Sequence, residues 1–387
     1  MLYIKEQKKI LTMILPGADE YHSLLESLGD FFEQEILPTA KKVDQEGIFP
    51  RQNLEQLQKK RIMALPFPEE YNGSGLPFPV YIAAVEMLAR ACANTALQVS
   101  VQGMVCEGIR LFGDDRQKRE YLREKGLVEG KRLIAFALTE PCCGSDAKSI
   151  QTEAVLSGDA YILNGSKILI TNAGEADFTL VFAKTGNGIS SFVVPKETPG
   201  FTVMRVIPKL GFRGNSLSAI HLKDCRVSRK NLLGKEGEGL EQAKQLLNSG
   251  RLTIAAMAVG IAQAAYERAL SYSKQRKAFG ESISHFQLVQ EKLADMVTGI
   301  HASRLLVYYA AGLKDKGEDI ASEAAQAKLF ASETSVRVCD EAIQIHGGYG
   351  YIDEYDVHRY WRDARMLTIG EGTSDMLRLL IAHLAIK

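Results

Sequence analysis

The feature that most constrains the fold of this chain is a double change in its hydrophobic periodicity. Apolar residues recur at three- and four-residue spacing in the first third and again in the last, which is typical of helices. Between these regions the apolar runs are short, β-rich and separated by turn-forming residues, which is typical of strands. We therefore predict an α+β multidomain fold, with an N-terminal all-α domain over 1–132, a middle antiparallel β-barrel or β-sandwich domain over 133–238 and a C-terminal four-helix bundle over 239–387.

The predicted C-terminal helices have broad apolar faces that are rich in alanine. Such faces favour helices packed in a bundle over a free coiled coil, whose apolar seam is narrower. The pattern predicts helices over 21–43, 80–90 and 95–111 in the N-terminal region, and over 251–275, 286–314, 321–345 and 374–386 in the C-terminal region.

One β-hairpin in the middle region is predicted from its turn. The apolar runs 161–163 and 168–170 flank Asn164-Gly165, and both turn residues tolerate positive φ. Further short strands are predicted over 179–183, 191–194, 202–207 and 218–222.

The charge balance and the apolar runs exclude several classes of partner. Lys and Arg number 47 and so do Asp and Glu, so the net charge is zero and we predict no nucleic-acid partner. We expect no membrane insertion, since no apolar run is long enough to cross a bilayer. The first 16 residues match neither a signal peptide nor a mitochondrial presequence well, because they include the acidic Glu6 and lack arginine. We predict a cytoplasmic protein, or one of the mitochondrial matrix in a eukaryote, although no clear presequence supports the matrix.

The six cysteines indicate free thiols in a reducing compartment. None lies in a Cys-x-x-Cys pair and none forms a zinc-finger pattern with histidine, so the spacing predicts no metal site. Cys142 and Cys143 are adjacent, and we predict no disulfide between them because such a bond would be strained.

Two motifs in the middle region are candidates for ligand contacts. The sequence TEPCCGSD over 139–146 follows a predicted strand and forms a turn that would expose backbone N–H groups and a hydroxyl. The second motif is NGSK over 164–167 with ITN over 170–172. Taken alone, the first also fits an ordinary strand-end turn and the second an ordinary hairpin.

Two further motifs lie in the C-terminal region. The sequence RKAFG over 276–280 closes a predicted helix, where an arginine can complement the helix dipole or pair with a pyrophosphate. The last block contains QIHGGYG over 344–350 and EGTS over 371–374. Glu371 is flanked by Gly370 and Gly372, which permit close approach of a ligand, and Ser374 is placed to cap the final helix. A glutamate in such a loop could also be a solvated turn residue.

In this order and spacing, the four motifs together strongly resemble the acyl-CoA dehydrogenase family, over nearly the whole chain from about residue 20 to residue 386. The resemblance implies FAD as the cofactor and an acyl-CoA as the substrate. It places Ser145, Arg251 and Gly372 near the substrate. The positions that match FAD contacts are Thr139, Gly144, Ser145, Thr171, Arg276, Phe279, Gln287, Gln344, Gly347, Gly348 and Thr373.

The resemblance also implies the chemistry. Glu371 is the implied catalytic base that removes an α-proton of the thioester while a β-hydride passes to flavin N5. The backbone N–H of Glu371 and a ribityl hydroxyl of FAD would stabilise the enolate oxygen. Burial beside an apolar substrate is expected to raise the pKa of Glu371 toward neutrality. Some family branches carry the base just before the position of Arg251, where this chain has Gly250, so Glu371 is the matching candidate.

The chain departs from the family pattern at several positions. Cys142 and Cys143 replace a commoner Gly-Ala pair and are expected either near FAD or as inert buried thiols. Leu169 replaces a common Trp and Gly370 a common Tyr, which leaves the chain-length preference open, and Ala278 replaces a common Thr.

The resemblance further implies partners and leaves rivals. It implies an electron-transferring flavoprotein as electron acceptor and an obligate dimer, commonly arranged as a dimer of dimers. The alternatives are an acyl-CoA oxidase, a nitroalkane oxidase, a DNA-associated flavoprotein or a non-catalytic member of the same fold. The chain length and Glu371 favour a dehydrogenase over the oxidases, and the neutral charge argues against DNA binding.

Overall fold

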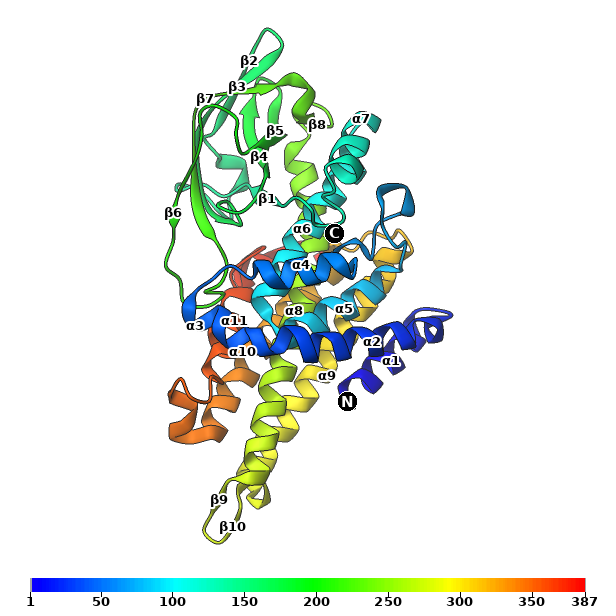
Figure 1. The fold of residues 1–387 in the computed structure, drawn as a ribbon, viewed down its shortest axis with the longest axis vertical. Coiled ribbons are helices and arrows are strands. Elements are labelled where there is room, and N and C mark those ends of the chain that lie inside the picture. The colour runs from blue at the N-terminus through cyan, green and yellow to red at the C-terminus, as the bar shows by residue number, and fades with distance from the viewer. Residues whose placement is uncertain (1, 387) are drawn as a thin grey trace.

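Helices from the two ends of the chain pack together, and the strands between them form a separate region at one end of the molecule (Figure 1). The computed structural model describes residues 2–386. The N-terminal helices are α1 (Leu2–Ile14), α2 (His22–Phe31), α3 (Ala40–Glu46), α4 (Arg51–Lys59), α5 (Phe78–Ala91), α6 (Ala93–Phe112) and α7 (Asp115–Gln117).

The prediction of one helix over 21–43 is correct in its helical character but wrong in its regularity. The segment passes from α2 through a π-helical turn (Phe32–Ile36) and a 3₁₀ turn (Leu37–Thr39) into α3. Pro38 lies in the 3₁₀ turn, and its ring and missing N–H interrupt a regular α-helix.

The middle region is one mostly antiparallel sheet of eight strands. The strands are β1 (Ile134–Ala137), β2 (Glu153–Ser157), β3 (Ala160–Thr171), β4 (Phe178–Thr185), β5 (Gly188–Pro195), β6 (Phe201–Val206), β7 (Leu217–Ser228) and β8 (Leu232–Leu233). Their order is β6-β7-β3-β2-β4-β5-β8, and β1 pairs with β4 in parallel. The four further strands predicted from the sequence lie within β4, β5, β6 and β7, although the run 202–207 extends one residue past the end of β6.

The predicted hairpin at Asn164-Gly165 is wrong. Strand β3 continues through both residues, and its pairing with β7 shifts register between Leu163 and Gly165. Gly165 has φ +152°, and a Cβ there would lie 2.5 Å from Thr152 Oγ1. The Asn164 side chain accepts a hydrogen bond from the backbone N–H of Asp224 at 2.7 Å. The Asn-Gly pair therefore forms a bulge within a strand, and the tight turn joins β2 to β3 instead.

The C-terminal region contains α8 (Gly239–Gln275), α9 (Gln287–Asp315), α10 (Ala321–His346), α11 (His358–Leu367) and α12 (Ser374–Ile386). A hairpin of β9 (Lys277–Ala278) and β10 (Glu281–Ser282) joins α8 to α9. Helix α8 starts at residue 239, well before the predicted 251, and α11 was not predicted. No helix within residues 2–386 is both long and apolar enough to cross a membrane.

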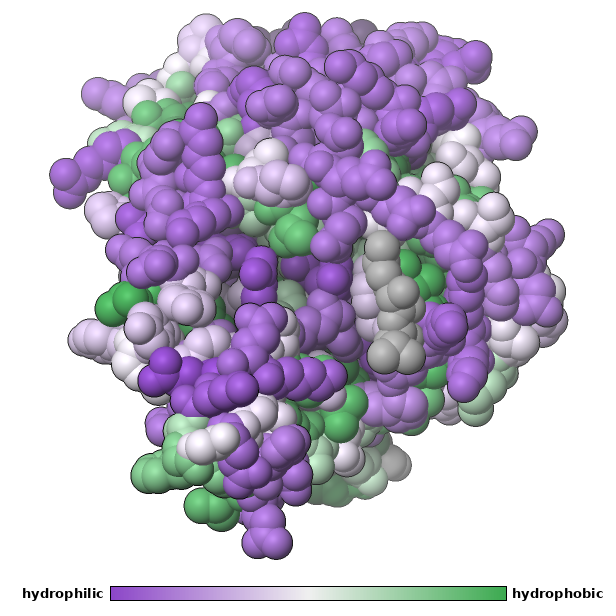
Figure 2. All heavy atoms as spheres, turned by 60° about the horizontal axis from the view of Figure 1, so that its bottom comes forward, coloured by the Kyte–Doolittle hydropathy of each residue, from purple (hydrophilic) through white to green (hydrophobic). Residues whose placement is uncertain are grey.

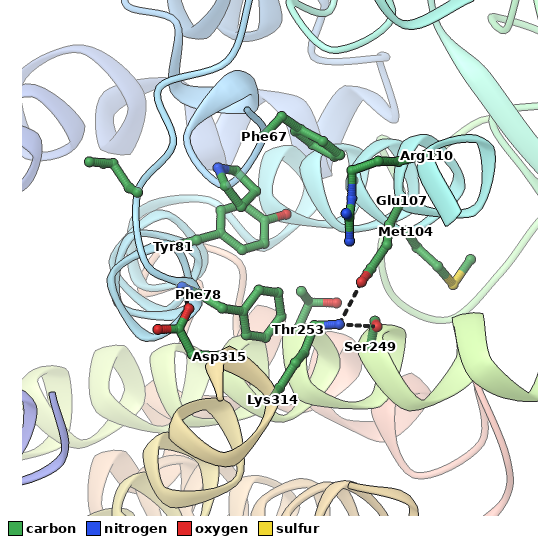
Figure 3. Close-up of a pocket in the computed structure, with 13 residues that line it drawn as sticks. Phe67, Phe78, Tyr81, Met104, Glu107, Arg110, Ser249, Thr253, Lys314 and Asp315 are labelled. Carbon is green, nitrogen blue, oxygen red and sulfur yellow. Dashed lines mark hydrogen bonds and ion pairs between the residues drawn. The ribbon is translucent and has the colours of Figure 1, made fainter. Parts of the chain in front are cut away.

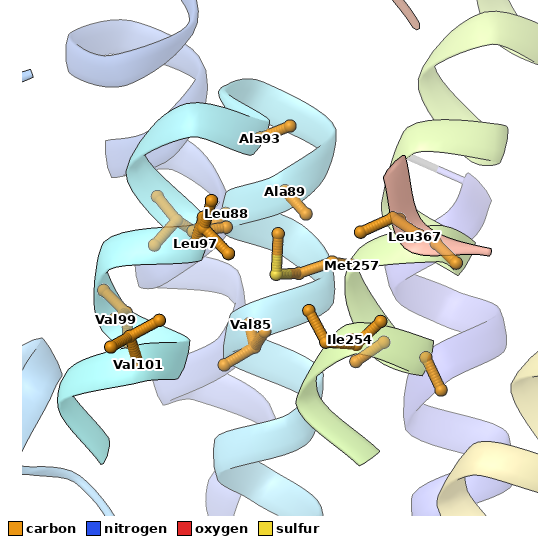
Figure 4. Close-up of a cluster of buried hydrophobic side chains, with 14 of the residues drawn as sticks. Val85, Leu88, Ala89, Ala93, Leu97, Val99, Val101, Ile254, Met257 and Leu367 are labelled. Atoms are coloured by element: carbon orange, nitrogen blue, oxygen red, sulfur yellow. The ribbon is translucent and has the colours of Figure 1, made fainter. Parts of the chain in front are cut away.

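The main hydrophobic core joins the N-terminal and C-terminal helices. Figure 4 shows Met257 and Ile254 of α8 facing Val85, Leu88 and Ala89 of α5, with side chains of α6 beside them. Small residues let α5 and α8 approach closely, because a Cβ at Gly260 would lie 2.2 Å from the carbonyl oxygen of Glu86.

A buried ionic network reinforces this packing. Arg304 of α9 donates from Nε to Glu86 Oε1 of α5 at 2.9 Å, and Tyr308 donates to Glu86 Oε2 at 3.0 Å. Removing one partner would leave a buried charge unpaired, which costs on the order of 3–5 kcal/mol. On the face shown in Figure 2, hydrophilic side chains predominate and hydrophobic ones form separate patches.

Candidate active site

The backbone of the loop between α11 and α12 is strained at Glu371. Glu371 has φ +52° and Gly372 has φ +103°, and a glutamate in the left-handed region requires support from its surroundings. That support comes from two cations, the buried Lys328 and the half-buried Arg251. Lys328 of α10 donates to the carbonyl oxygen of Gly372 at 2.6 Å, and Arg251 Nε of α8 donates to the carbonyl oxygen of Glu371 at 3.4 Å.

The side chain of Glu371 occupies space that α8 leaves free at Gly250. A Cβ on Gly250 would lie 2.1 Å from Glu371 Oε2 and 2.7 Å from its Cδ. Oε2 is shielded from solvent and has no hydrogen-bond partner among the described residues. A carboxylate oxygen without a protein partner is available to a bound ligand.

The surroundings of Glu371 bring its pKa close to neutral pH. Burial raises its pKa to about 7, against the opposing effects of Lys328 and Arg251. Burial likewise lowers the pKa of Lys328 to about 8. A carboxylate with a pKa near 7 suits a general base.

The candidate turn over 139–146 is supported from inside the sheet by Lys167. This lysine is fully buried and donates to Glu140 Oε1 at 2.7 Å and to the carbonyl oxygen of Leu138 at 3.1 Å. Ile168 donates its backbone N–H to the carbonyl oxygen of Thr139 at 3.0 Å. The structure therefore brings together the two middle-region motifs. No role was predicted for Lys167 from the sequence, where it appears only as the last residue of the NGSK motif over 164–167.

The residues at the end of β3 form the other side of this region. Leu169 has φ +58° and an exposed fraction of 54%. Asn215 Nδ2 lies 3.5 Å from Thr171 Oγ1, and the side-chain oxygens of Asn172 and Asn215 are buried without a partner in the described chain. Exposed apolar surface beside unpaired buried acceptors is suited to a ligand.

A second group of predicted cofactor residues lies at the opposite end of α8. Arg276, Gly347 and Gly348 line a shallow depression of about 490 Å³. Phe279, at the tip of the β9–β10 hairpin, has an exposed fraction of 98%. Figure 1 shows this hairpin at the end of the molecule farthest from the sheet. Gln287 and Gln344 are also exposed.

One chain therefore does not bring all the predicted site residues together. Glu371, Gly372 and Arg251 lie together, and Thr139, Gly144, Ser145 and Thr171 belong to the two connected middle-region motifs. Thr373 lies two residues after Glu371 and caps α12, since its Oγ1 accepts the backbone N–H of Met376 at 3.3 Å. The expectation that Ser374 provides this cap is wrong, because Ser374 Oγ has no partner in the described chain.

A cavity borders the part of α8 that contacts Glu371. It has a volume of about 220 Å³, and its wall includes Ser249, which directly precedes Gly250 (Figure 3). Lys314 donates to Ser249 Oγ at 2.8 Å and pairs with Glu107 at 2.5 Å. Arg110 also lines the cavity, so its wall combines charged groups with aromatic rings.

Comparison with known proteins identifies the family of this chain. The sequence matches three described domains: the acyl-CoA dehydrogenase N-terminal domain over residues 18–129, the middle domain over 135–225 and the C-terminal domain over 237–385. It is 45% identical to the probable acyl-CoA dehydrogenase YngJ of Bacillus subtilis, across 95% of this chain and 98% of that protein. The chain belongs to the acyl-CoA dehydrogenase family.

Solved structures agree with this membership of the acyl-CoA dehydrogenase family. Butyryl-CoA dehydrogenase from Megasphaera elsdenii superimposes with a TM-score of 0.91 at 40% identity, over 94% of this chain and 97% of the other. A chain from the structure described as the electron transferring flavoprotein of Acidaminococcus fermentans gives a TM-score of 0.92 at 41% identity, also over 94% and 97%. The predicted family and three-part fold are confirmed, and the chain is an acyl-CoA dehydrogenase enzyme of a flavin-dependent family.

Proposed function

We propose that this enzyme converts an acyl-CoA thioester to the trans-2-enoyl-CoA, with Glu371 as the base that removes the α-proton. The observation that carries the proposal is the Glu371 carboxylate, whose Oε2 is shielded from solvent and lacks a protein partner. Its pKa of about 7 lets the unprotonated form accept a proton at neutral pH.

The loop geometry supports stabilisation of the thioester oxygen. A carboxylate can remove so weakly acidic a proton only if the developing enolate oxygen receives hydrogen bonds. Glu371 and Gly372 have positive φ angles, which set the course of the loop backbone. Arg251 and Lys328 hold this backbone in place by donating hydrogen bonds to its carbonyl oxygens. The backbone N–H of Glu371 is the donor that we propose for this oxygen.

The residues present fit FAD as the cofactor, which would supply the acceptor for the β-hydride. Exposed Leu169 and the unpaired acceptors of Asn172 and Asn215 suit one part of a large planar ligand. Arg276 suits a pyrophosphate, and a Cβ at Gly347 or Gly348 would meet no described atom within 4 Å, so a ligand can approach the backbone closely. The proposed holding residues are Thr139, Gly144, Ser145, Thr171, Gln287, Gln344, Thr373, Arg276, Phe279, Gly347 and Gly348.

These FAD residues form two groups at opposite ends of α8, which supports a site shared between two subunits. Arg276 and the exposed Phe279 would then complete the site of a second copy of the chain. We propose a dimer as the smallest active form, and an electron-transferring flavoprotein as the acceptor of the electrons, in keeping with the structural relative from Acidaminococcus fermentans.

We propose a short acyl chain as the preferred substrate. The butyryl-CoA dehydrogenase of Megasphaera elsdenii supports this preference. The cavity in Figure 3 would be unfavourable for a long saturated tail, because Arg110, Glu107 and Lys314 would lose solvent without gaining polar partners.

The test is an anaerobic titration of the flavin-loaded protein with butyryl-CoA, octanoyl-CoA and a branched acyl-CoA. We expect butyryl-CoA to bleach the flavin absorbance fastest, and Glu371→Gln to retain flavin while losing this reaction by at least about 10³-fold. Glu318→Gln, an exposed carboxylate, is the matched control and should react normally. Retention of normal bleaching by Glu371→Gln would overturn the assignment of the base.

A further inference from the structure

The turn after β1 carries a cluster of donor atoms that the proposed dehydrogenation does not use. Cys142 Sγ lies 3.5 Å from Cys143 Sγ and 3.8 Å from Glu140 Oε2. One oxygen of Glu140 and the two sulfurs all lie within 4.8 Å of one another. Within residues 2–386, no other group of three histidine, cysteine or acidic side chains meets this spacing.

The backbone holds these side chains in place. Glu140 and Cys143 exchange two hydrogen bonds across the turn, from N–H to carbonyl oxygen at 2.9 and 3.2 Å. Pro141 occupies the second position of the turn, where its fixed φ is favourable. Residues 140 and 143 therefore lie opposite each other, with Cys142 between them on the exposed side.

The Glu140 carboxylate is also fixed in orientation. Its Oε1 accepts from Lys167 Nζ at 2.7 Å and from the backbone N–H of Thr152 at 3.0 Å. Its Oε2 accepts from the backbone N–H of Gln151 and is the oxygen nearest to Cys142 Sγ. A carboxylate oriented by other hydrogen bonds is a suitable metal ligand, since little freedom is lost on binding.

Adjacent cysteines are better suited to chelation than to a disulfide. Their Cα atoms are about 3.8 Å apart across a trans peptide, whereas disulfides span roughly 4.4 Å or more. A Zn–S bond is about 2.3 Å long, which places two sulfurs of a tetrahedral site ~3.8 Å apart. The observed separation of 3.5 Å is close to that value, so one ion can contact both sulfurs without a rearrangement of the turn.

We propose that Glu140, Cys142 and Cys143 form a binding site for one thiophilic divalent cation, of the class of Zn²⁺ and Cd²⁺. Each thiol gives up its proton to solvent as its sulfur binds the ion. The exposed position of Cys142 leaves a path for entry and a fourth coordination position for water. Sequence spacing does not indicate this site, because its ligands lie in one tight turn and their geometry depends on Lys167 in a different strand.

The test uses Cd²⁺ with the full-length protein and follows the thiolate-to-metal charge-transfer absorbance in the near ultraviolet together with equilibrium dialysis. We expect one Cd²⁺ per chain at this site. The double variant C142A/C143A should weaken binding by at least about 10²-fold. The matched control C225A, which removes a buried cysteine in β7, should bind as the unchanged protein does.

A second measurement does not depend on any variant. In the unchanged protein Cys142 is exposed and four of the other cysteines are deeply buried, so alkylation followed by mass spectrometry should modify Cys142 first. One equivalent of Cd²⁺ should slow that modification at least tenfold. Absence of both the absorbance band and the protection, or normal Cd²⁺ binding by the double variant, would overturn the proposal whether or not the enzyme turns over acyl-CoA.

Discussion

At the scale of single residues, the protonation state of Glu371 depends on its immediate neighbours. Burial favours the neutral acid, while Lys328 and Arg251 favour the carboxylate, and the balance leaves a pKa of about 7. The same cations hold the strained loop through its carbonyl oxygens. Protonation and loop geometry are therefore coupled at this site.

This pKa predicts the pH dependence of the half-reaction. The base acts only when it is unprotonated, so the rate of flavin bleaching by substrate should rise with pH up to about 7 and level off above it. Stopped-flow measurement under anaerobic conditions between about pH 5.5 and 9 tests this. A rate independent of pH over that range would show that another group or step is limiting.

Substitution of Lys328 should affect both geometry and protonation. Lys328→Met removes the hydrogen bond to Gly372 and a cation that favours the Glu371 carboxylate, so the pKa of Glu371 should rise and the pH profile should move to higher pH. We expect a fall of about 10–100-fold in the bleaching rate at neutral pH with flavin content unchanged. Lys328→Arg is the control, since a retained cation should keep the profile close to the original. A profile unmoved in Lys328→Met would exclude this positioning role.

Gly250 should be intolerant of even one added methyl group. Gly250→Ala places a Cβ 2.1 Å from Glu371 Oε2, and the displaced carboxylate should lower the bleaching rate by roughly 10²-fold. Alanine favours helix, so the fold should persist by circular dichroism. Ser271→Ala, on the exposed end of the same helix, should leave the rate unchanged. A fully active Gly250→Ala would mean that the carboxylate has more room than the structure gives it.

At the scale of elements, β3 carries the connection between the two middle-region motifs. Lys167 and Ile168 of this strand contact the turn over 139–146, and the bulge at Gly165 lies just before them. Correct formation of the bulge should therefore be needed for correct placement of the turn.

The bulge gives a prediction for stability. Gly165→Ala should lower the free energy of unfolding by about 2–4 kcal/mol, because its Cβ would lie 2.7 Å from the backbone of Thr152. Gly158 also has a positive φ, of +63°, but a Cβ there meets no described atom within 4 Å, so we expect Gly158→Ala to lose only about 1 kcal/mol. Urea unfolding followed by circular dichroism compares the two variants. Equal losses would contradict the steric explanation.

At the scale of the whole molecule, the proposed cofactor residues lie at both ends of α8. The sheet with the middle-region motifs lies towards one end of α8, and Glu371, the proposed base, contacts this helix at Gly250 and Arg251 in its N-terminal third. Arg276 and the exposed hairpin lie at the other end. A complete site would therefore need the hairpin of a second subunit.

Mixed oligomers test this arrangement. Glu371→Gln supplies an intact hairpin without a base, and Arg276→Glu supplies an intact base with a defective hairpin, so each protein alone should be almost inactive. In a mixed dimer, one site would combine the intact base with the intact hairpin. We expect refolded mixtures to regain up to about a quarter of the unmodified activity, since half of random dimers are mixed and each has one good site. No recovery, with mixed dimers demonstrated by mass spectrometry, would place all cofactor contacts within one chain.

The sequence by itself determined the order of helical and β regions, and it singled out Glu371 as the proposed base. Hydrophobic periodicity is a local property, and it located α5, α6, α9, α10 and α12 closely because their apolar faces repeat over many turns. Glu371 was identifiable because its flanking glycines and neighbouring motifs lie in one short segment.

Only the tertiary structure decided which distant groups meet. It placed the Glu371 carboxylate against Gly250. It also brought Lys328 within hydrogen-bonding distance of the carbonyl oxygen of Gly372, and Lys167 within hydrogen-bonding distance of the Glu140 carboxylate. It also made Asn164-Gly165 a bulge, because the space around Gly165 is set by Thr152 and the partner strand is β7. These contacts join residues far apart in the chain, and their energies depend on burial and distance, which local patterns do not contain.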